Sequence, residues 1–250
     1  MSSRGSASAG SERTRLSAAE LRVIPVTGLP EISPGDDLPE LLAAVLASGP
    51  GLLDGDVLVV AQKVVSKAEG RIETARTREE RTALVLAEAQ QVRRRRDDFL
   101  IVQTKHGFVC ATAGIDHSNA PGEDTVILLP IDPDASAAGL RQRLGERFGV
   151  SVAVIVSDSF GRAWRTGTTD VAIGLSGMLA LNDLRGLADR SGRPLETTQI
   201  AVADELASAA ELVMGKVNGV PAAVIRGYRV PGGDGSARDL VMPPELDLFP

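Results

Sequence analysis

Cysteine, histidine and aromatic residues are scarce in this sequence. Its 250 residues include one cysteine, Cys110, which excludes an intrachain disulfide and a multi-cysteine metal site. The two histidines, His106 and His117, have no partner at the spacing of a metal site. We expect His106 to be exposed in a hairpin turn. Because aromatic residues are only 3% of the chain, we expect a core built mainly from Ala, Val, Leu and Ile.

Long apolar runs and a surplus of basic residues are also absent. No apolar run approaches the ~20 residues of a membrane-spanning helix, and the polar N-terminus lacks the apolar segment of a signal peptide. The net charge of −6 argues against a nucleic-acid partner, because proteins that bind nucleic acid usually carry a basic surplus. We interpret the one basic run, Arg93–Arg96, as a solvent-exposed helix end, since two aspartates follow it. These features favour a cytoplasmic enzyme with neither nucleic acid nor a membrane as its partner.

Strand and helix patterns alternate along the chain, but several strands form hairpin-like pairs. The sequence therefore predicts an α+β fold with mixed sheets and flanking helices rather than a doubly wound sheet. We expect a disordered tail over residues 1–17, one domain over 18–230 and a Gly/Pro-rich tail over 231–250. Strands are expected within 21–32, 56–70, 99–104, 107–114, 125–130, 152–156 and 221–228, and helices from 38, over 78–92, within 132–144 and within 200–216.

The segment Val152–Asp170 carries the densest group of chemically useful residues. Five apolar residues, Val152–Val156, predict a buried strand, and Asp158 and Ser159 follow where we expect that strand to end. Two glycines, two arginines, three threonines and the single tryptophan come next. A strand that presents a carboxylate, a hydroxyl and guanidinium groups at one place suits a metal ion and an anionic ligand. We interpret this segment as part of an active site.

A second carboxylate occurs in a similar context. Asp116 and Asp158 each follow a strand pattern, and each is followed closely by a hydroxyl residue, Ser118 or Ser159. Oxygen ligands without a Cys or His cluster favour Mg²⁺ or Mn²⁺ over Zn²⁺. The alternative is that each aspartate only caps a helix or tightens a turn.

Basic side chains near these carboxylates are candidates for binding phosphate. Lys63 and Lys67 follow an apolar strand pattern, and Arg162 and Arg165 flank Trp164. Lysine binds phosphate as a point charge, and arginine binds it through two parallel hydrogen bonds. Lysines of this kind are more commonly surface residues, and Trp164 is either a core anchor or a stacking surface. No phosphate-binding loop of the Walker type and no G-x-G-x-x-G fingerprint is present.

Five segments, in order, resemble one known family. They read GLPEI, DVLVVAQKVVSKAEGR, AGIDHSN, VSDSFGRAWRTGTTDVAIG and AVADELASAAELVMGK. From Leu21 to Arg229 the chain resembles the coenzyme F420-0:L-glutamate ligases, which in actinobacteria form the N-terminal half of a two-domain protein. The resemblance implies a GTP-dependent ligase that adds L-glutamate, and then γ-linked glutamates, to F420-0 and releases GDP and phosphate. It also implies an intertwined homodimer, two Mg²⁺ or Mn²⁺ ions and a monovalent cation.

The resemblance also implies roles for individual residues. Asp116 and Asp158 match ligands of a first metal ion, and Ser159 matches a ligand of a second. The residues expected to take part in catalysis are Asp116, Asp158, Lys67, Arg162 and Arg165. The residues expected to bind the nucleotide are Leu29, Pro30, Glu31, Ile32, Gln62, Lys67, Asn119, Met214, Gly215, Lys216, Val217, Asn218, Gly219, Val220 and Pro221.

Two features depart from the family pattern. Lys216 stands where family members often carry glutamine, and a protonated lysine cannot bind a metal ion. The chain ends at Pro250, so it is either a stand-alone ligase or a fragment of the two-domain form. Two other functions use the same residue types: a metal-dependent phosphohydrolase or kinase, and a non-catalytic nucleotide-binding module.

Overall fold

The structure is a computed structural model that describes residues 20–248. The expected disordered tail over 1–17 lies outside the described residues. Within them, strands and helices combine in a mixed α and β arrangement with several sheets, which confirms the predicted fold class. No helix in the described part of the chain is long and apolar enough to span a bilayer.

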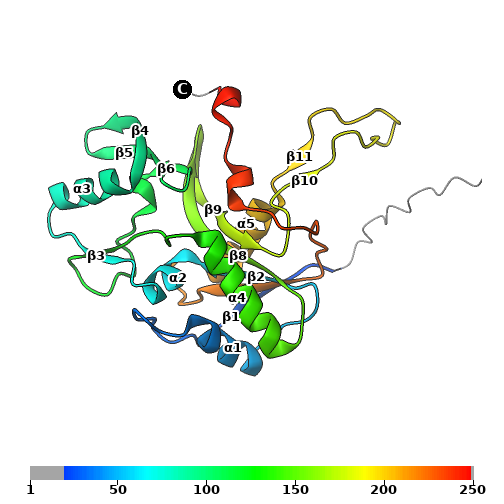
Figure 1. The fold of residues 1–250 in the computed structure, drawn as a ribbon, viewed down its shortest axis with the longest axis horizontal. Coiled ribbons are helices and arrows are strands. Elements are labelled where there is room, and N and C mark those ends of the chain that lie inside the picture. The colour runs from blue at the N-terminus through cyan, green and yellow to red at the C-terminus, as the bar shows by residue number, and fades with distance from the viewer. Residues whose placement is uncertain (1–19, 249–250) are drawn as a thin grey trace, which may run out of the picture.

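A five-stranded mixed sheet forms the centre of the molecule (Figure 1). The strand order is β1-β12-β2-β8-β9, in which β2 and β8 are parallel and every other neighbouring pair is antiparallel. The strands are β1 (Arg22–Val26), β2 (Val57–Ala61), β8 (Ala153–Arg162), β9 (Arg165–Ser176) and β12 (Ala222–Arg226). The apolar runs of β2 and β12 are buried on both faces, as expected for a sheet covered on both sides.

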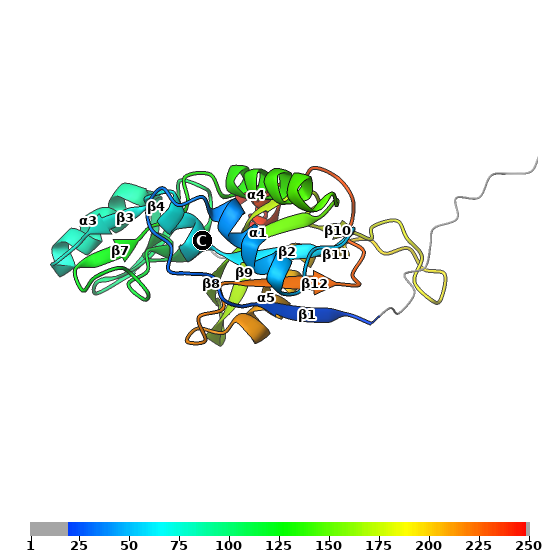
Figure 2. The same ribbon diagram turned by 90° about the horizontal axis from the view of Figure 1, so that it is seen from below.

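Helices cover the two faces of this sheet (Figure 2). Helices α1 (Leu38–Ser48) and α4 (Pro133–Phe148) contact each other on one face, and α5 (Val202–Met214) lies on the other. A side chain at Gly174 in β9 would collide with Pro133, because its Cβ would lie 2.3 Å from the Pro133 carbonyl carbon. The missing side chain therefore lets α4 begin directly against the sheet. Most buried core residues are aliphatic, and Phe108 is the only buried aromatic among the described residues, as the composition predicted.

A second group of elements extends from one side of the central sheet and is built around two small sheets. Two of its apolar clusters are separate from the main core, and one of them joins Val85, Leu100 and Val102, whereas Val65 and Phe108 belong to the main core. The pairing is β3 with β7 and β4-β5-β6. The elements are α2 (Gln62–Ala68), β3 (Ile72–Thr74), α3 (Arg78–Glu88), β4 (Ala89–Arg96), β5 (Phe99–Thr104), β6 (Val109–Ala111), the 3-10 turn η1 (Thr112–Gly114) and β7 (Thr125–Ile127).

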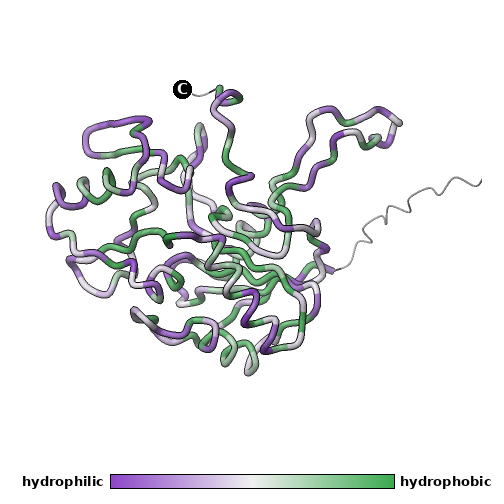
Figure 3. The backbone as a smooth tube through the Cα atoms, in the orientation of Figure 1, coloured by the Kyte–Doolittle hydropathy of each residue, from purple (hydrophilic) through white to green (hydrophobic). Residues whose placement is uncertain are grey.

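The remaining segments project from the body or return along it. The two short strands β10 (Asn182–Asp183) and β11 (Gln199–Ile200) begin a long hairpin that projects from the body in Figure 1. In Figure 3 apolar residues concentrate in the central strands, and polar residues dominate the tip of the β4–β5 hairpin. The C-terminal segment contains η2 (Ala237–Leu240) and η3 (Pro244–Leu246). It is attached to the body, since Ala237 is buried and the Gly235 N–H donates to Met178 O.

Several expected boundaries are wrong. The strand expected within 56–70 ends at Ala61, and the next seven residues form α2, so both lysines lie on a helix. The strand through Val156 does not end at Asp158 but continues to Arg162. The helix expected over 78–92 ends at Glu88, and Arg93–Arg96 lie in β4 rather than at a helix end. Pairing with the apolar strand β5 overrides the intrinsic helical preference of this segment, which is rich in arginine and glutamine.

One buried ion pair connects the central sheet to the loop before β2. Asp56 is 1% exposed, and the Arg226 guanidinium donates to both of its carboxylate oxygens, with Nη2 2.7 Å from Oδ2 and Nε 3.0 Å from Oδ1. Arg226 also lies 3.4 Å from Gly51 O. Removal of the arginine would leave a buried carboxylate without a counter-charge, which is more costly than loss of an exposed pair.

We therefore expect Arg226→Met to lower the free energy of unfolding by about 3–5 kcal/mol. Arg185→Met, which removes an arginine from the exposed pair with Asp183, serves as the matched control and should cost less than about 1 kcal/mol. Urea denaturation followed by circular dichroism measures both values. Equal losses in the two variants would contradict the account of Asp56 as a buried charge that depends on Arg226.

Candidate active site

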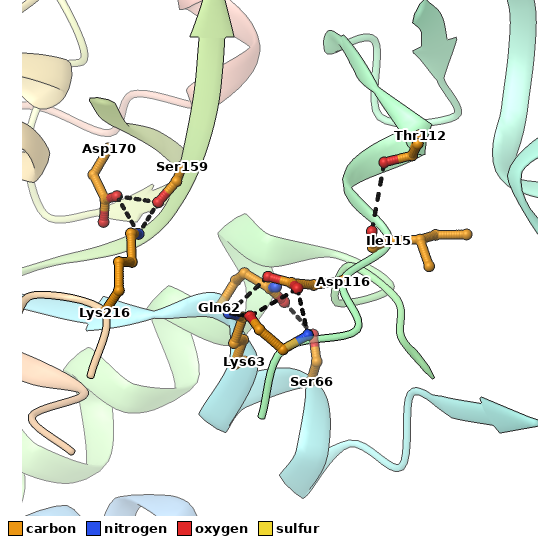
Figure 4. A network of polar contacts seen from close by, with 10 residues as sticks. Gln62, Lys63, Ser66, Thr112, Ile115, Asp116, Ser159, Asp170 and Lys216 are labelled. Carbon is orange, nitrogen blue, oxygen red and sulfur yellow. Dashed lines mark hydrogen bonds and ion pairs between the residues drawn. The ribbon is translucent and has the colours of Figure 1, made fainter. Parts of the chain in front are cut away.

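The candidate site lies where β2 ends beside β8. These strands are parallel and in register, Val57 opposite Ala153 and Ala61 opposite Ser157, so both run towards the same edge of the sheet. Helix α2 begins directly after β2, and β8 continues past this edge into the hairpin with β9. The loop after η1 and the loop after α5 bring further polar side chains to the same region (Figure 4).

Asp116 is held by a lysine and a serine. Lys63 Nζ lies 2.6 Å from Asp116 Oδ2, and the Ser118 N–H and hydroxyl donate to Oδ1 at 2.7 and 2.8 Å. Lys63 also donates to the Ser118 hydroxyl at 2.6 Å. Burial raises the pKa of Asp116, but the hydrogen bonds from Lys63 and Ser118 outweigh it and hold the pKa below its ordinary value. Asp116 is therefore ionised at neutral pH.

Asp158 has the opposite electrostatic environment. Its pKa is raised to about 7, chiefly by burial and also by the negative charges of Asp116 and Asp170, against the opposing effects of the Ser159 N–H and Lys63. These influences identify Asp116, Asp170 and Lys63 as electrostatic neighbours of Asp158. Since a divalent cation would stabilise the ionised form, this carboxyl is suited to cation binding.

Cys110 lies on β6, close enough to Asp158 to be affected by its charge. The thiol is buried, and burial raises its pKa to about 12, with a further contribution from the negative charge of Asp158. A thiol with so high a pKa is protonated at neutral pH and is a poor nucleophile and metal ligand. The only cysteine of the chain therefore takes no part in the chemistry of this region.

A second polar group lies around Asp170 on β9. Asp170 is 4% exposed and accepts hydrogen bonds from the hydroxyls of Ser157, at 3.0 Å, and Ser159, at 2.5 Å. Lys216 Nζ lies 3.1 Å from Asp170 Oδ1 and also donates to the Ser159 hydroxyl. Figure 4 shows Ser159, Asp170 and Lys216 as one connected group. The site therefore has two halves, one around Asp116 and one around Asp170. Consecutive side chains of a strand point to opposite faces, so Asp158 belongs to the first half and Ser159 to the second.

Asp170 ends the segment interpreted as part of an active site, but the sequence assigns it no role of its own. The sequence signal that could have found it is the register of the β8–β9 hairpin, in which Ser159 lies directly opposite Asp170. That register includes shifts after Val156 and after Gly161, which no simple alternation pattern predicts. The loop sequence did single out Lys216, but its partner could be identified only from the fold.

Gln62 and Lys67 occupy buried positions on α2. Gln62 is 1% exposed, and its Oε1 accepts from the Ser66 hydroxyl at 2.8 Å. Its Nε2 has no hydrogen-bond partner within residues 20–248. A buried donor left unpaired costs about 1–3 kcal/mol, so this amide is suited to an acceptor on a ligand or water. Lys67 is buried as well and forms an ion pair with the exposed Glu31, which brings the loop after β1 to the same helix.

Other predicted residues lie at the hairpin tip or in the loops beside these groups. Arg162 and Arg165 pair across the tip of the β8–β9 hairpin, ~13 Å along the strand from Asp158 at about 3.3 Å per residue. Trp164 in the same tip is 79% exposed, so the alternative of a core anchor is wrong. In the loop after α5, Met214 is buried and Val217 is exposed. Leu29, Pro30, Ile32 and Asn119 lie in the two loops that carry Glu31 and Asp116.

His106 also differs from the expectation. It lies in the predicted turn between β5 and β6, but it is half-buried rather than exposed. Its Nε2 lies 2.9 Å from Pro130 O, and its ring stacks on Phe108 with the centroids 5.7 Å apart. His106 therefore contributes to packing beside the site.

The carboxylates fit one divalent cation of the magnesium type. No cluster of three or more His, Cys, Asp or Glu side chains within residues 20–248 is arranged to hold a metal ion. Mg²⁺, however, is commonly bound by one or two carboxylates together with water and substrate phosphates. Asp116, whose pKa is lowered, and Asp158, whose pKa is raised, are neighbours and provide such a pair of carboxylates.

Comparison with known proteins identifies close relatives. The family model described as F420-0:Gamma-glutamyl ligase matches residues 27–227. The chain is 43% identical to the Coenzyme F420:L-glutamate ligase of Methanothermobacter thermautotrophicus over 92% of this chain and 98% of that protein. It is 44% identical to the protein of the same name from Methanopyrus kandleri, over 92% and 97%. The protein of that name from Methanocaldococcus jannaschii is 41% identical over 92% and 98%.

The raised pKa of Asp158 predicts how stability depends on pH. The folded carboxyl has a pKa of about 7, against 3.8 as its ordinary value, so the folded state holds the proton more tightly between these pH values. The stability contributed by Asp158 is therefore present at low pH and is lost as the pH rises towards 7. An amide in place of this carboxyl would not titrate.

In metal-free protein, we expect Asp158→Asn to be more stable than the wild type at pH 8, by a few kcal/mol at most, but not at pH 4. Urea denaturation in the presence of a chelator measures this difference. Asp234→Asn, at an exposed carboxyl, is the matched control and should show no such dependence. A pH-independent difference for Asp158→Asn would show that this carboxyl is not perturbed.

Proposed function

Because this chain belongs to the F420-0:gamma-glutamyl ligase family, we propose that it joins L-glutamate to coenzyme F420-0 and releases GDP and phosphate from GTP. Further γ-linked glutamates follow in the same way. The observation that carries the proposal is the meeting of Asp116, Asp158 and Lys63 at the carboxyl end of β2, beside β8. The alignment over nearly the whole length of ligases from other organisms supports it.

Formation of an amide from a carboxylate requires that the carboxylate first be activated. In the proposed reaction, a carboxylate oxygen of F420-0 attacks the γ-phosphorus of GTP, and the bond to the β,γ-bridging oxygen breaks to release GDP. The amine of L-glutamate then attacks the acyl carbon of the acyl phosphate and loses a proton, and phosphate leaves. Both reactants of the first step are anions, so the site must supply positive charge to bring them together.

The lysines of the site supply part of that charge. Lys63 and Lys67 are four residues apart on α2 and therefore lie on one side of the helix. Each is now paired with a carboxylate, Asp116 or Glu31. A phosphate that enters the site would compete for these ammonium groups, and exposed Glu31 is free to move away from Lys67 because it is on a surface loop.

A divalent cation completes the charge balance in this proposal. Asp116 and Asp158 would hold Mg²⁺ or Mn²⁺, which when bound neutralises charge on the phosphates. The resemblance to the family also implies a monovalent cation, to which no residue is assigned.

The nucleotide is proposed to lie along α2 and the loops beside it. The unpaired Gln62 amide offers a buried donor to an acceptor atom of the nucleotide. The loops that contain Leu29–Ile32, Asn119 and Met214–Pro221 flank the same region. Arg162 and Arg165, at the exposed hairpin tip, are available to the anionic parts of the substrates. The choice of GTP over ATP is taken from the family.

We further propose that the protein is a homodimer and acts in the cytoplasm. Large exposed apolar side chains support the dimer, since Trp164 is 79%, Leu212 82% and Val217 93% exposed. A partner copy would cover such residues. Sedimentation velocity would report a single species of twice the chain mass, and a monomer at all concentrations would contradict this proposal.

Mass spectrometry tests the ligase reaction directly. The reaction mixture contains F420-0, L-glutamate, GTP and Mn²⁺, and the expected products are F420-0 extended by one or more glutamyl residues. Omission of GTP should abolish them. GTP hydrolysis without glutamyl products would indicate a phosphohydrolase, and GTP binding without turnover a non-catalytic module.

We expect Asp158→Asn to lower kcat for glutamyl transfer at least about 100-fold, because the variant loses a carboxylate ligand of the cation. Asp234→Asn, an exposed carboxyl away from the site, is the control and should retain wild-type turnover. Circular dichroism verifies that both variants are folded. Near-normal turnover of Asp158→Asn would remove Asp158 from the proposed cation site.

A further inference from the structure

Lys216 reaches back into the sheet from the loop after α5. The loop turns at Gly215, which has a φ of +59° and ends the helix. The Lys216 ammonium donates to the Ser159 hydroxyl and lies 3.1 Å from Asp170 Oδ1 (Figure 4). Its side chain is 51% exposed, whereas that of Asp170 is 5% exposed. One end of this pair is therefore fixed in the protein, and the other borders solvent.

Asp170 makes this position attractive to a cation. Its carboxylate is nearly buried and also accepts hydrogen bonds from the hydroxyls of Ser157 and Ser159. A buried carboxylate is costly unless a positive charge compensates it. Lys216 provides that charge, so the cation in this half of the site is a side chain of the protein.

Ser159 is not open to a second divalent ion in this arrangement. A hydroxyl has one donor and two acceptor lone pairs. The Ser159 hydroxyl donates to Asp170 and accepts from Lys216. A metal ion at the ~2.1 Å of a magnesium–oxygen bond from Ser159 would lie against the ammonium group. Repulsion between the two cations, and the lack of a lone pair on the ammonium, exclude both at this position, where the single charge of Asp170 is already matched by Lys216. Asp116 differs, because it and Asp158 set two carboxylates against the one charge of Lys63.

We propose that Lys216, anchored by Asp170, replaces a second divalent cation at Ser159, so that the chain binds one divalent ion fewer than its oxygen ligands would otherwise hold. The inference rests on the proposed function, in which phosphate groups enter this edge of the sheet. Two of the three ammonium N–H groups of Lys216 are used by Ser159 and Asp170. The third is available to an anionic phosphate oxygen, which lysine binds as a point charge.

The number of Mn²⁺ ions bound per chain tests this inference. Equilibrium dialysis with electron paramagnetic resonance of free Mn²⁺ counts the ions on the full-length protein, with Mn²⁺ alone and again with GDP. The wild type should bind one ion. Lys216→Gln, which removes the charge and adds an amide oxygen, should bind one ion more than the wild type in at least one condition. Lys216→Ala, a second variant at the same half-exposed loop position, should show the same gain.

A double variant identifies where the extra ion binds. Lys216→Gln combined with Asp170→Asn lacks the carboxylate and should return to the wild-type number. Equal numbers for the wild type and both single variants in both conditions would overturn the inference, as would an extra ion that persists in the double variant.

The number of Mn²⁺ ions bound by the wild type separately tests the proposed cation site at Asp116 and Asp158. No ion on the wild type would contradict that site. The difference between the wild type and the Lys216 variants would still decide the role of Lys216.

Discussion

The parallel pairing of β2 with β8 is the constraint on which the rest of this structure depends. These strands belong to segments almost a hundred residues apart, and their register places Ala61 opposite Ser157. Lysines on α2 follow one strand at this edge, and Asp158 continues the other. Slippage by one residue would turn Asp158 to the opposite face of the sheet. The apolar core that fixes the pairing therefore also fixes the relation between the cations and carboxylates of the site.

The site is a balance of buried charges in two halves. In one half, Lys63 keeps Asp116 ionised, while the pKa of Asp158 is raised to about 7 by burial and by its acidic neighbours. In the other half, Asp170 is compensated by Lys216 from a different part of the chain. The first half sets two carboxylates against one lysine and can attract a metal ion, whereas in the second half one carboxylate is matched by one lysine. This asymmetry links the proposed metal chemistry to the substitution at Lys216.

The sequence predicted the components of the site better than their arrangement. Asp116 and Asp158 could be identified because each follows an apolar strand and precedes a hydroxyl residue. Asp170 could not, because its role depends on a hairpin whose register shifts twice. Val64 and Val65 continue the apolar pattern of β2, so the sequence predicts a strand where helix α2 begins at Gln62. The arginines of β4 were assigned to a helix because their pairing with β5 depends on contacts outside the segment. Local pattern thus predicts candidate residues, and long-range pairing determines which of them meet.

The most direct test of carboxylate activation follows an oxygen atom. F420-0 labelled with ¹⁸O in its reacting carboxylate is incubated with GTP, L-glutamate and Mn²⁺, and the released phosphate is analysed by mass spectrometry. The account predicts one ¹⁸O atom in each phosphate, because the attacking carboxylate oxygen stays with phosphorus when the amine displaces it. Unlabelled phosphate released together with glutamylated product would contradict an acyl phosphate and, with it, the assigned role of this site.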